Sequence, residues 1–392
     1  MYDVVVIGGG PSGATAAEEL ANTGHKVALL DREGRIKPCG GAIPPRLMED
    51  FHIGEEQLIA KVTTARMVSP TGRKVDIPIE NGFVGMVDRK DFDPYLRARA
   101  SQAGADYHIG TFLRIERKSD AKHVIYRNKS NGDEHRLPFR LAIGADGARS
   151  RVGKAEVDGW DKIPYVLAYH EIIEAPQDAT TYDPMRCDVV YDGSISPDFY
   201  GWVFPHGDSA SVGMGTGHTD IDLKGATAAL RAASGLSDCK TLRKEGAPIP
   251  LHPLDRWDNG TDLVLAGDAA GVVAPSSGEG IYYAMFAGRL AATACTETLK
   301  SHDARNLKLA RKLFMKEHRT VFRVLQSMQN AYYRSDDRRE RFVSLCHDTD
   351  VQRLTFEAYM HKKLVKSRPM PHIKIGLKNI AHLTGLVSPE HT

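Results

Sequence analysis

The sequence VVVIGGGPSG at residues 4–13 decides the fold of this 392-residue chain. Its first four residues are a short β-branched run without polar alternation, which is typical of a buried parallel strand. Glycines with the spacing G-x-G-x-x-G follow at Gly8, Gly10 and Gly13. Gly8 permits a tight turn, Gly10 lets the backbone approach a pyrophosphate, and Gly13 allows close packing of a helix on the strand.

The flanking residues complete a βαβ unit. Residues 14–20 are rich in helix formers, and KVALLD at residues 26–31 reads as a second strand. Asp31 ends this strand, where a carboxylate can accept hydrogen bonds from ribose hydroxyls, while the helix N-terminus faces the phosphates. A dinucleotide site is therefore predicted. The fingerprint does not distinguish FAD from NAD(P) as the cofactor. Arg32 or Arg35 could also bind the 2′-phosphate of NADP.

The bulk composition is that of a globular protein, with a net charge of +2 that hides an uneven distribution. From residue 301 onward there are 18 Lys+Arg against 9 Asp+Glu, which leaves 34 against 41 in the remainder. A basic end of this kind indicates either an anionic partner or membrane surface, or a solvated helical face. The cysteines lack metal-ligand spacing and are odd in number, so we expect a reducing compartment, no metal and no disulfide framework. They are Cys39, Cys187, Cys239, Cys295 and Cys346.

Two later segments favour FAD. LAIGADGARS at residues 141–150 reads as a strand that runs into a glycine turn, and LVLAGDAAG at residues 263–271 is another buried strand, which ends at Gly267 and Asp268. Asp268 can hold a ribityl hydroxyl there, with the next helix N-terminus facing the pyrophosphate. Together with the N-terminal unit, these segments resemble the FAD-binding signature of the p-hydroxybenzoate-hydroxylase-like flavoprotein superfamily.

This resemblance implies a set of cofactor residues. VDRKDFDPYL at residues 87–96 resembles the family's helix start, whose arginine lies along the cofactor, and APSSGEGI at residues 274–281 resembles the loop that donates N–H groups toward flavin N1 and O2. Glu279 in that loop is expected to be a surface carboxylate. No second glycine fingerprint is present, so NADPH would dock transiently or a ferredoxin would supply electrons. The expected cofactor residues are Gly8, Gly10, Ser12, Gly13, Asp31, Arg32, Cys39, Gly40, Gly41, Ala42, Arg89, Asp146, Gly267, Asp268, Gly278, Gly280 and Ile281.

Two further segments concern the substrate. The loop PCGGAIPP at residues 38–45 follows the second strand, and its glycines let the backbone pass close to a flat ring. In YGWVFP at residues 200–205, strand alternation places Tyr200, Trp202 and Phe204 on one face. That face is either domain core or the wall of an apolar channel.

The Cys-Gly-Gly loop and the Y-x-W-x-F-P motif, with GMG at residues 213–215 downstream, resemble the geranylgeranyl reductases. The stretches at residues 37–44, 69–74 and 82–89 look closest to the branch that serves chlorophyll and bacteriochlorophyll synthesis. The resemblance implies stepwise reduction of three isolated double bonds of a geranylgeranyl chain, carried by a pigment ester, a free diphosphate or both. A flavin monooxygenase and a non-catalytic prenyl-binding escort protein remain alternatives, and we expect no nucleic-acid partner.

An isolated alkene has no electron-withdrawing neighbour, so its reduction requires an acid, exclusion of water and electron-rich walls around the developing positive charge. Trp202 and Tyr200 are candidate walls, since aromatic faces attract cations. Cys39 is a candidate acid or positioning group, although a small packing residue would look the same.

The predicted fold is α/β, with a Rossmann-type FAD-binding domain, an inserted antiparallel-sheet substrate domain and a helical C-terminal region. The expected domains are residues 1–62, 88–158 and 258–300 for FAD, residues 63–87 and 159–257 for the sheet, and residues 301–392 for the helices. Because a strand is predicted to start at Tyr2, we expect no secretory signal, and no apolar run of the sequence has bilayer-spanning length. We expect a cytoplasmic protein, peripheral on a photosynthetic membrane if the amphipathic segment at residues 372–383 lies on lipid rather than on the protein.

Overall fold

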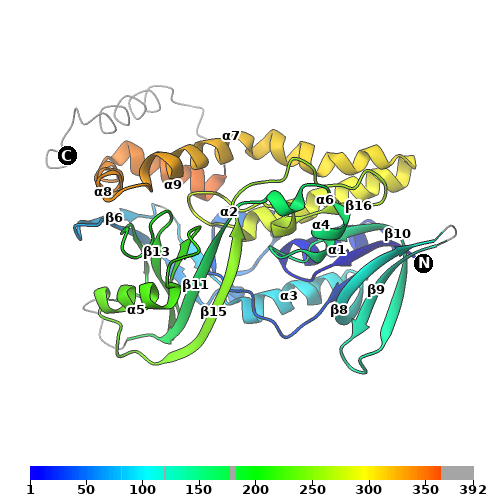
Figure 1. Ribbon diagram of the computed structural model, residues 1–392, viewed down its shortest axis with the longest axis horizontal. Helices are drawn as coiled ribbons and strands as arrows, with labels where there is room; N and C mark the ends of the chain where they lie inside the picture. Colours follow the sequence, from blue (N-terminus) through cyan, green and yellow to red (C-terminus); the bar gives the residue numbers. More distant parts are fainter. Residues whose placement is uncertain (81, 119–120, 177–181, 363–392) are drawn as a thin grey trace. The chain divides into compact units, whose positions relative to one another are not determined.

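The computed structural model describes residues 1–80, 82–118, 121–176 and 182–362 (Figure 1). The chain forms two compact units, each assembled from separate stretches of sequence. The first comprises Met1–Lys37, Arg89–Tyr165 and Pro248–Arg319, and the second comprises Pro38–Asp88, Val166–Ala247 and Thr320–Thr392.

A mostly parallel sheet forms the centre of the first unit. β1 (Tyr2–Ile7) lies between β2 (Val27–Asp31) and β10 (Glu134–Gly144), and all three run parallel, as the buried apolar runs predicted. β8 (Asp106–Arg117) extends the sheet beyond β2, and β16 (Leu263–Leu265) extends it beyond β10. β9 (Lys122–Asn128) pairs antiparallel with β8 and with β10. The Rossmann-type architecture is confirmed.

The helices of this unit include α1 and α6, which pack closely together. A Cβ at Gly288 of α6 would stand 2.1 Å from the carbonyl oxygen of Ser12 in α1, so this glycine allows the two helix backbones to approach. Up to residue 301, the helical elements of this unit are α1 (Pro11–Asn22), α3 (Arg89–Gln102), α4 (Arg151–Glu156), η2 (Trp160–Lys162), η3 (Gly267–Ala270) and α6 (Ile281–Ser301).

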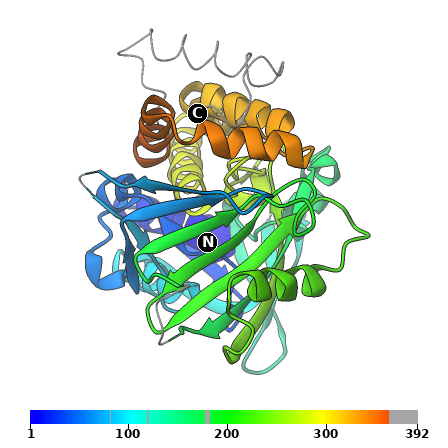
Figure 2. The ribbon, with the colours of Figure 1, turned by 90° about the vertical axis from the view of Figure 1, so that its left-hand side faces the viewer.

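The second unit is built on a large sheet with the strand order β15-β11-β14-β13-β12-β5-β6. The expected, mostly antiparallel sheet is confirmed: β11–β14, β14–β13, β13–β12 and β5–β6 pair antiparallel, whereas β12 and β5 run parallel. One face of the sheet packs against α5 (Leu223–Ala233) through apolar residues such as Val203, Val212 and Leu230 (Figure 2). The strands are β5 (Thr64–Val68), β6 (Lys74–Pro78), β11 (Tyr165–Glu174), β12 (Arg186–Val190), β13 (Gly201–His206), β14 (Ser209–Thr216) and β15 (Thr241–Pro250).

A small sheet in the same unit holds the loop that follows residue 37. Its central strand, β7 (Val84–Met86), pairs antiparallel with β3 (Ala42–Ile43) and with β4 (Ala60–Val62). Two short helical segments, α2 (Pro45–Phe51) and η1 (Glu55–Gln57), connect β3 to β4. The glycine loop is therefore held by backbone pairing on its C-terminal side.

The described part of the C-terminal region, up to residue 362, is helical as expected; its elements are η4 (Ala304–Lys308), α7 (Leu309–Tyr332), α8 (Asp336–Leu345) and α9 (Thr349–His361). The predicted helix at residues 304–330 begins with a 3-10 turn, in which the Asp303 side chain accepts a hydrogen bond from the Arg305 amide. Within the described part of the chain, no helix is long and apolar enough to cross a membrane. The amphipathic segment at residues 372–383 lies outside the described residues.

Candidate cofactor and substrate sites

Two glycines of the fingerprint are required by the fold of the first unit, whereas a third leaves open space beside the backbone. Gly8 has a φ of 107°, and a Cβ on Gly13 would stand 1.8 Å from the Gly8 carbonyl oxygen, so the fold itself requires both. A Cβ on Gly10 would instead meet no heavy atom nearer than Nη2 of Arg89, at 3.9 Å. The protein thus leaves space above Gly10, as expected where a pyrophosphate approaches the backbone. The residues present fit a bound dinucleotide.

The side chains around the fingerprint form a polar rim. Oδ2 of Asp31 accepts a hydrogen bond from the Gly9 amide at 2.7 Å, which holds the carboxylate beside the loop. The buried guanidinium of Arg89 donates to both oxygens of Asp93, at 2.6 and 2.7 Å, and lies next to Gly10. Ser12 Oγ is buried and has no hydrogen-bond partner among the residues that the structure describes. A buried hydroxyl without a partner at this position could donate a hydrogen bond to a phosphate oxygen of the cofactor.

The segment at residues 263–271, with Gly267 and Asp268, begins with β16. The Asp268 side chain is buried and forms an ion pair with Lys37. Gly278 has a φ of 65°, and Gly280 precedes α6, which starts at Ile281. The expectation that Glu279 is a surface carboxylate was wrong, because the residue is only 9% exposed. The loop folds back on itself, because the Ala274 amide donates a hydrogen bond to the Glu279 carbonyl oxygen.

Asp146 has a local structural role in addition to any contact with a cofactor. Its carboxylate accepts hydrogen bonds from the Ser150 hydroxyl and from the amides of Arg151 and Val152, and these bonds fix the start of α4. Burial raises the pKa of Asp146, against the lowering effect of these hydrogen bonds. Its backbone borders Gly8, since a Cβ on Gly8 would stand 2.8 Å from the Asp146 Cα. Arg32 lies exposed after β2.

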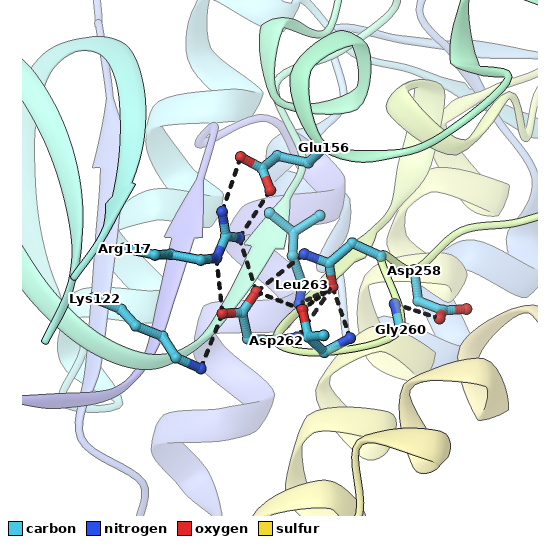
Figure 3. Close-up of polar contacts among 9 residues, drawn as sticks. Arg117, Lys122, Glu156, Asp258, Gly260, Asp262 and Leu263 are labelled. Carbon is cyan, nitrogen blue, oxygen red and sulfur yellow. Dashed lines mark hydrogen bonds and ion pairs between the residues drawn. The ribbon is translucent and has the colours of Figure 1, made fainter. Parts of the chain in front are cut away.

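A buried carboxylate fixes the strand that leads to Asp268. Asp262, with a side chain 1% exposed, forms ion pairs with Arg117 at 2.8 Å and with Lys122 at 2.9 Å (Figure 3). Burial alone would raise the pKa of Asp262, but the hydrogen bonds from Arg117, Asn259 and Lys122 hold it well below its ordinary value. The network joins β8 and β9 to the residue before β16.

The second unit brings together the two motifs that were noted separately in the sequence. A Cβ on Gly40 would stand 2.9 Å from Cδ2 of Phe204, so the glycine backbone lies directly against the Phe204 ring. The Nε2–H of His206 donates to the Gly40 carbonyl oxygen at 2.9 Å. Gly41, with a φ of 77°, donates its amide to Cys39 Sγ at 3.3 Å. The Cys-Gly-Gly loop therefore rests on the end of the Y-x-W-x-F-P strand.

The three aromatic side chains lie along one face, as expected. The ring centroids of Tyr200 and Trp202 are 6.1 Å apart, and those of Trp202 and Phe204 are 6.3 Å apart. Val203 between them belongs to the core under α5, so the aromatics occupy the opposite face of the sheet. Burial strongly raises the pKa of Tyr200, which keeps its hydroxyl neutral.

The structure explains why residue 213, the first of the GMG segment at residues 213–215, is a glycine. Gly213 pairs with Trp202 across β13–β14 and with His170 across β11–β14. A Cβ on Gly213 would stand 2.3 Å from the His170 Cβ and 2.6 Å from Cζ2 of Trp202. The glycine therefore makes room for the indole and the imidazole to meet above it, with ring centroids 6.1 Å apart.

Sequence reasoning missed two histidines at this site, His170 and His206. Both are buried, at 2% and 6% exposure, and both bond to groups far away in the sequence. The one available signal for His206 was its position directly after the Y-x-W-x-F-P motif. Nothing in the residues around His170 marks it, because its role depends on pairing between strands.

Comparison with known proteins gives consistent matches. Residues 1–158 match a family model described as "FAD binding domain". The chain is 64% identical over 391 residues to a geranylgeranyl diphosphate reductase of Rhodobacter capsulatus, with 100% of both chains covered. It is 36% identical to the geranylgeranyl diphosphate reductase of Synechocystis sp., with 97% of both covered. Among solved structures, a geranylgeranyl bacteriochlorophyll reductase-like protein of Thermoplasma acidophilum has a TM-score of 0.81 at 24% identity, covering 94% of this chain and 99% of that one, which shows a shared fold.

Proposed function

Because the chain belongs to the geranylgeranyl reductase family, we propose that it reduces three isolated double bonds of a geranylgeranyl group, one after another, to leave a phytyl group. It is a flavoprotein oxidoreductase that acts on the carbon–carbon double bonds of a geranylgeranyl group. The proposed carriers of this group are the free diphosphate and the bacteriochlorophyll or chlorophyll ester. The observation that carries the proposal is the 64% identity over the full length of the Rhodobacter capsulatus reductase.

FAD is the cofactor, and we propose that the first unit holds it through the fingerprint glycines, Asp31, Arg89 and Asp268. The space above Gly10 and the orphaned hydroxyl of Ser12 support this placement. When bound and reduced, FAD supplies the hydride for the alkene. The FAD-binding domain predicted from the sequence, residues 1–62, 88–158 and 258–300, stays a proposal, and its residues 38–62 belong to the second unit.

The aromatic face of β13 is proposed to bind the prenyl chain. Tyr200, Trp202 and Phe204 form a continuous row of rings on the face that α5 does not cover. Such a row removes apolar carbon from water and presents π faces to positive charge that develops on the alkene. The raised pKa of Tyr200 makes its hydroxyl a weak acid, which supports a role as wall rather than as proton donor.

Cys39 is proposed as the acid or as a positioning group for it. It is half-buried, and its sulfur accepts the Gly41 amide, which holds the thiol in the glycine loop. If this role is right, Cys39→Ala keeps its flavin but loses turnover. An unchanged rate would leave Cys39 as a packing residue.

NADPH is the proposed electron donor, docking transiently, with a ferredoxin-like protein as the alternative. We also propose peripheral contact with the photosynthetic membrane through the basic C-terminal region, which carries 18 Lys+Arg against 9 Asp+Glu from residue 301 onward. An anionic surface would attract this region, and a geranylgeranyl chain is apolar enough to favour lipid over water.

The test is anaerobic incubation of the purified flavoprotein with NADPH and geranylgeranyl diphosphate, and separately with geranylgeranyl bacteriochlorophyll, read by mass spectrometry. Successive gains of two hydrogens per double bond are expected with at least one substrate. Bleaching of the flavin without any gain of hydrogen would overturn the proposed substrates, and an added oxygen after admission of air would indicate a monooxygenase. Absence of bleaching, with reduction restored by reduced ferredoxin, would overturn NADPH as donor.

A further inference from the structure

A chain of buried polar groups leads away from the Trp202 indole inside the second unit. The indole Nε1–H donates to Ser211 Oγ at 3.1 Å. Ser211 Oγ lies 2.8 Å from His170 Nδ1, and His170 Nε2 lies 2.9 Å from Glu245 Oε2. The four groups come from β13, β14, β11 and β15, so they are assembled only by the pairing of the sheet.

The direction of these hydrogen bonds follows from what each group can donate. An ionised carboxylate only accepts, so His170 Nε2 carries the proton that binds Glu245. While the His170 ring is neutral, its Nδ1 is an acceptor and takes the single hydroxyl proton of Ser211. The Ser211 oxygen keeps lone pairs for the indole N–H, which can only donate. Every bond in the series thus points from Trp202 toward Glu245.

Glu245 is held as an anion at the end of this series. Arg243, on the same strand, forms an ion pair with Glu245, and its Nη2 also lies 3.3 Å from Oδ1 of Asp88. Burial would raise the pKa of Glu245, but the hydrogen bond from His170 and the charge of Arg243 hold it below its ordinary value. The series therefore ends on a fixed negative charge, and hydrogen bonds that point the same way polarise one another.

We propose that Ser211 and His170, anchored by Glu245, are positioning residues for alkene reduction that fix the Trp202 ring and increase the electron density of its π face. The inference rests on the proposed function, since it concerns the wall that stabilises positive charge on the prenyl chain. A hydrogen-bonded indole N–H shifts electron density into the ring, and a richer ring attracts a developing cation more strongly. Both effects act on the transition state more than on the bound substrate, so kcat is affected more than KM.

The kinetic test is a double-mutant cycle on the full-length flavoprotein. Ser211→Ala removes the acceptor of the indole proton, and Trp202→Phe keeps an aromatic ring but removes the proton itself. Each single variant is expected to lower kcat for alkene reduction at least tenfold with KM changed less than threefold. Because both act through the same hydrogen bond, Ser211→Ala in the Trp202→Phe background should cost no further activity. His170→Phe should behave like Ser211→Ala.

The matched control is Ser209→Ala, two residues earlier on β14, whose hydroxyl donates to the His206 carbonyl oxygen rather than to this series. It is expected to keep the wild-type kcat. A spectroscopic readout independent of turnover uses the indole ¹⁵N–¹H signals of the three tryptophans. Loss of one signal in Trp202→Phe identifies it, and Ser211→Ala and His170→Phe should shift that signal upfield while the other two stay in place.

The outcomes separate this inference from the proposed function. A wild-type protein that adds no hydrogen to any geranylgeranyl substrate overturns the proposed function and the catalytic part of this inference together. A wild-type reductase whose Ser211→Ala variant keeps kcat, or loses it equally in the Trp202→Phe background, overturns this inference alone. An indole signal that does not move in Ser211→Ala would overturn the hydrogen-bond series itself.

Discussion

Gly213 lies directly opposite Trp202, and a Cβ at this glycine would stand 2.6 Å from Cζ2 of the indole. On the other side of the same glycine, the His170 Cβ would be 2.3 Å away. Any side chain at position 213 must therefore displace the ring that we propose as a wall of the substrate site.

Gly213→Ala is expected to lower both stability and turnover. The added methyl group forces Trp202 and His170 apart, and overpacking of this kind costs about 1–3 kcal/mol. We expect a lower thermal midpoint and at least a tenfold lower kcat for alkene reduction, measured on flavin-loaded protein. Gly82→Ala is the control, because its Cβ would meet only Met360 Cε, at 3.9 Å. Unchanged turnover in Gly213→Ala would argue against Trp202 as a wall.

His206 gives a prediction about pH. Burial lowers its pKa below the ordinary 6.5, and its Nδ1 has no hydrogen-bond partner among the described residues, so the protonated ring is disfavoured in the fold. The unfolded chain then binds more protons than the folded one, and stability falls as the pH drops below about 6.5 toward the folded pKa.

His206→Gln should therefore lose less stability than the wild type between pH 6.5 and pH 5, as measured by urea unfolding across that range. The glutamine amide can still donate to the Gly40 carbonyl oxygen, whereas the side chain of His206→Leu cannot. His218→Gln, at a half-exposed position, is the control. Identical pH slopes in the wild type and His206→Gln would contradict the assignment.

Gly10 and Gly13 should respond differently to alanine. Gly13→Ala places a Cβ 1.8 Å from the Gly8 carbonyl oxygen and is expected to disrupt the fold of the first unit. Gly10→Ala meets no heavy atom within 3.8 Å, so the apoprotein should keep its thermal midpoint. FAD affinity should nevertheless fall at least tenfold, because the methyl group occupies the space proposed for the pyrophosphate. Fluorescence titration of apoprotein with FAD measures this, and full affinity in Gly10→Ala would contradict the proposed pose.

Asp262 is expected to matter for stability rather than for chemistry. Asp262→Asn leaves Arg117 and Lys122 without their buried partner, which should cost on the order of 2–3 kcal/mol at pH 7. Because the folded pKa lies well below the ordinary 3.8, this contribution is present above about pH 3.8 and is lost as the pH falls further. Urea unfolding at pH 7 and pH 3.5 should show a difference that shrinks on acidification. The control Asp158→Asn, at an exposed carboxylate, should change little at either pH.

The sequence by itself determined the Rossmann-type fold, because its signals are local. A β-branched run, glycines at fixed spacing and a terminal acid all lie within residues 4–31. Each of these signals depends only on residues that are close together in the sequence. The same holds for the strand before Gly267 and Asp268 and for the alternating aromatics of residues 200–205. The error at Glu279 arose because a carboxylate in a small-residue loop carries no local signal of its burial.

Only the tertiary structure decided what surrounds the aromatic face. Three sets of contacts there join residues up to 166 positions apart. They are the contact of Gly40 with Phe204, the hydrogen bond from His206 to Gly40, and the series from Trp202 through Ser211 and His170 to Glu245. Such contacts depend on strand order and register, and a shift of one residue would turn every side chain to the other face of the sheet. A local pattern can place an aromatic on a strand, but only the paired strands determine which polar groups meet it.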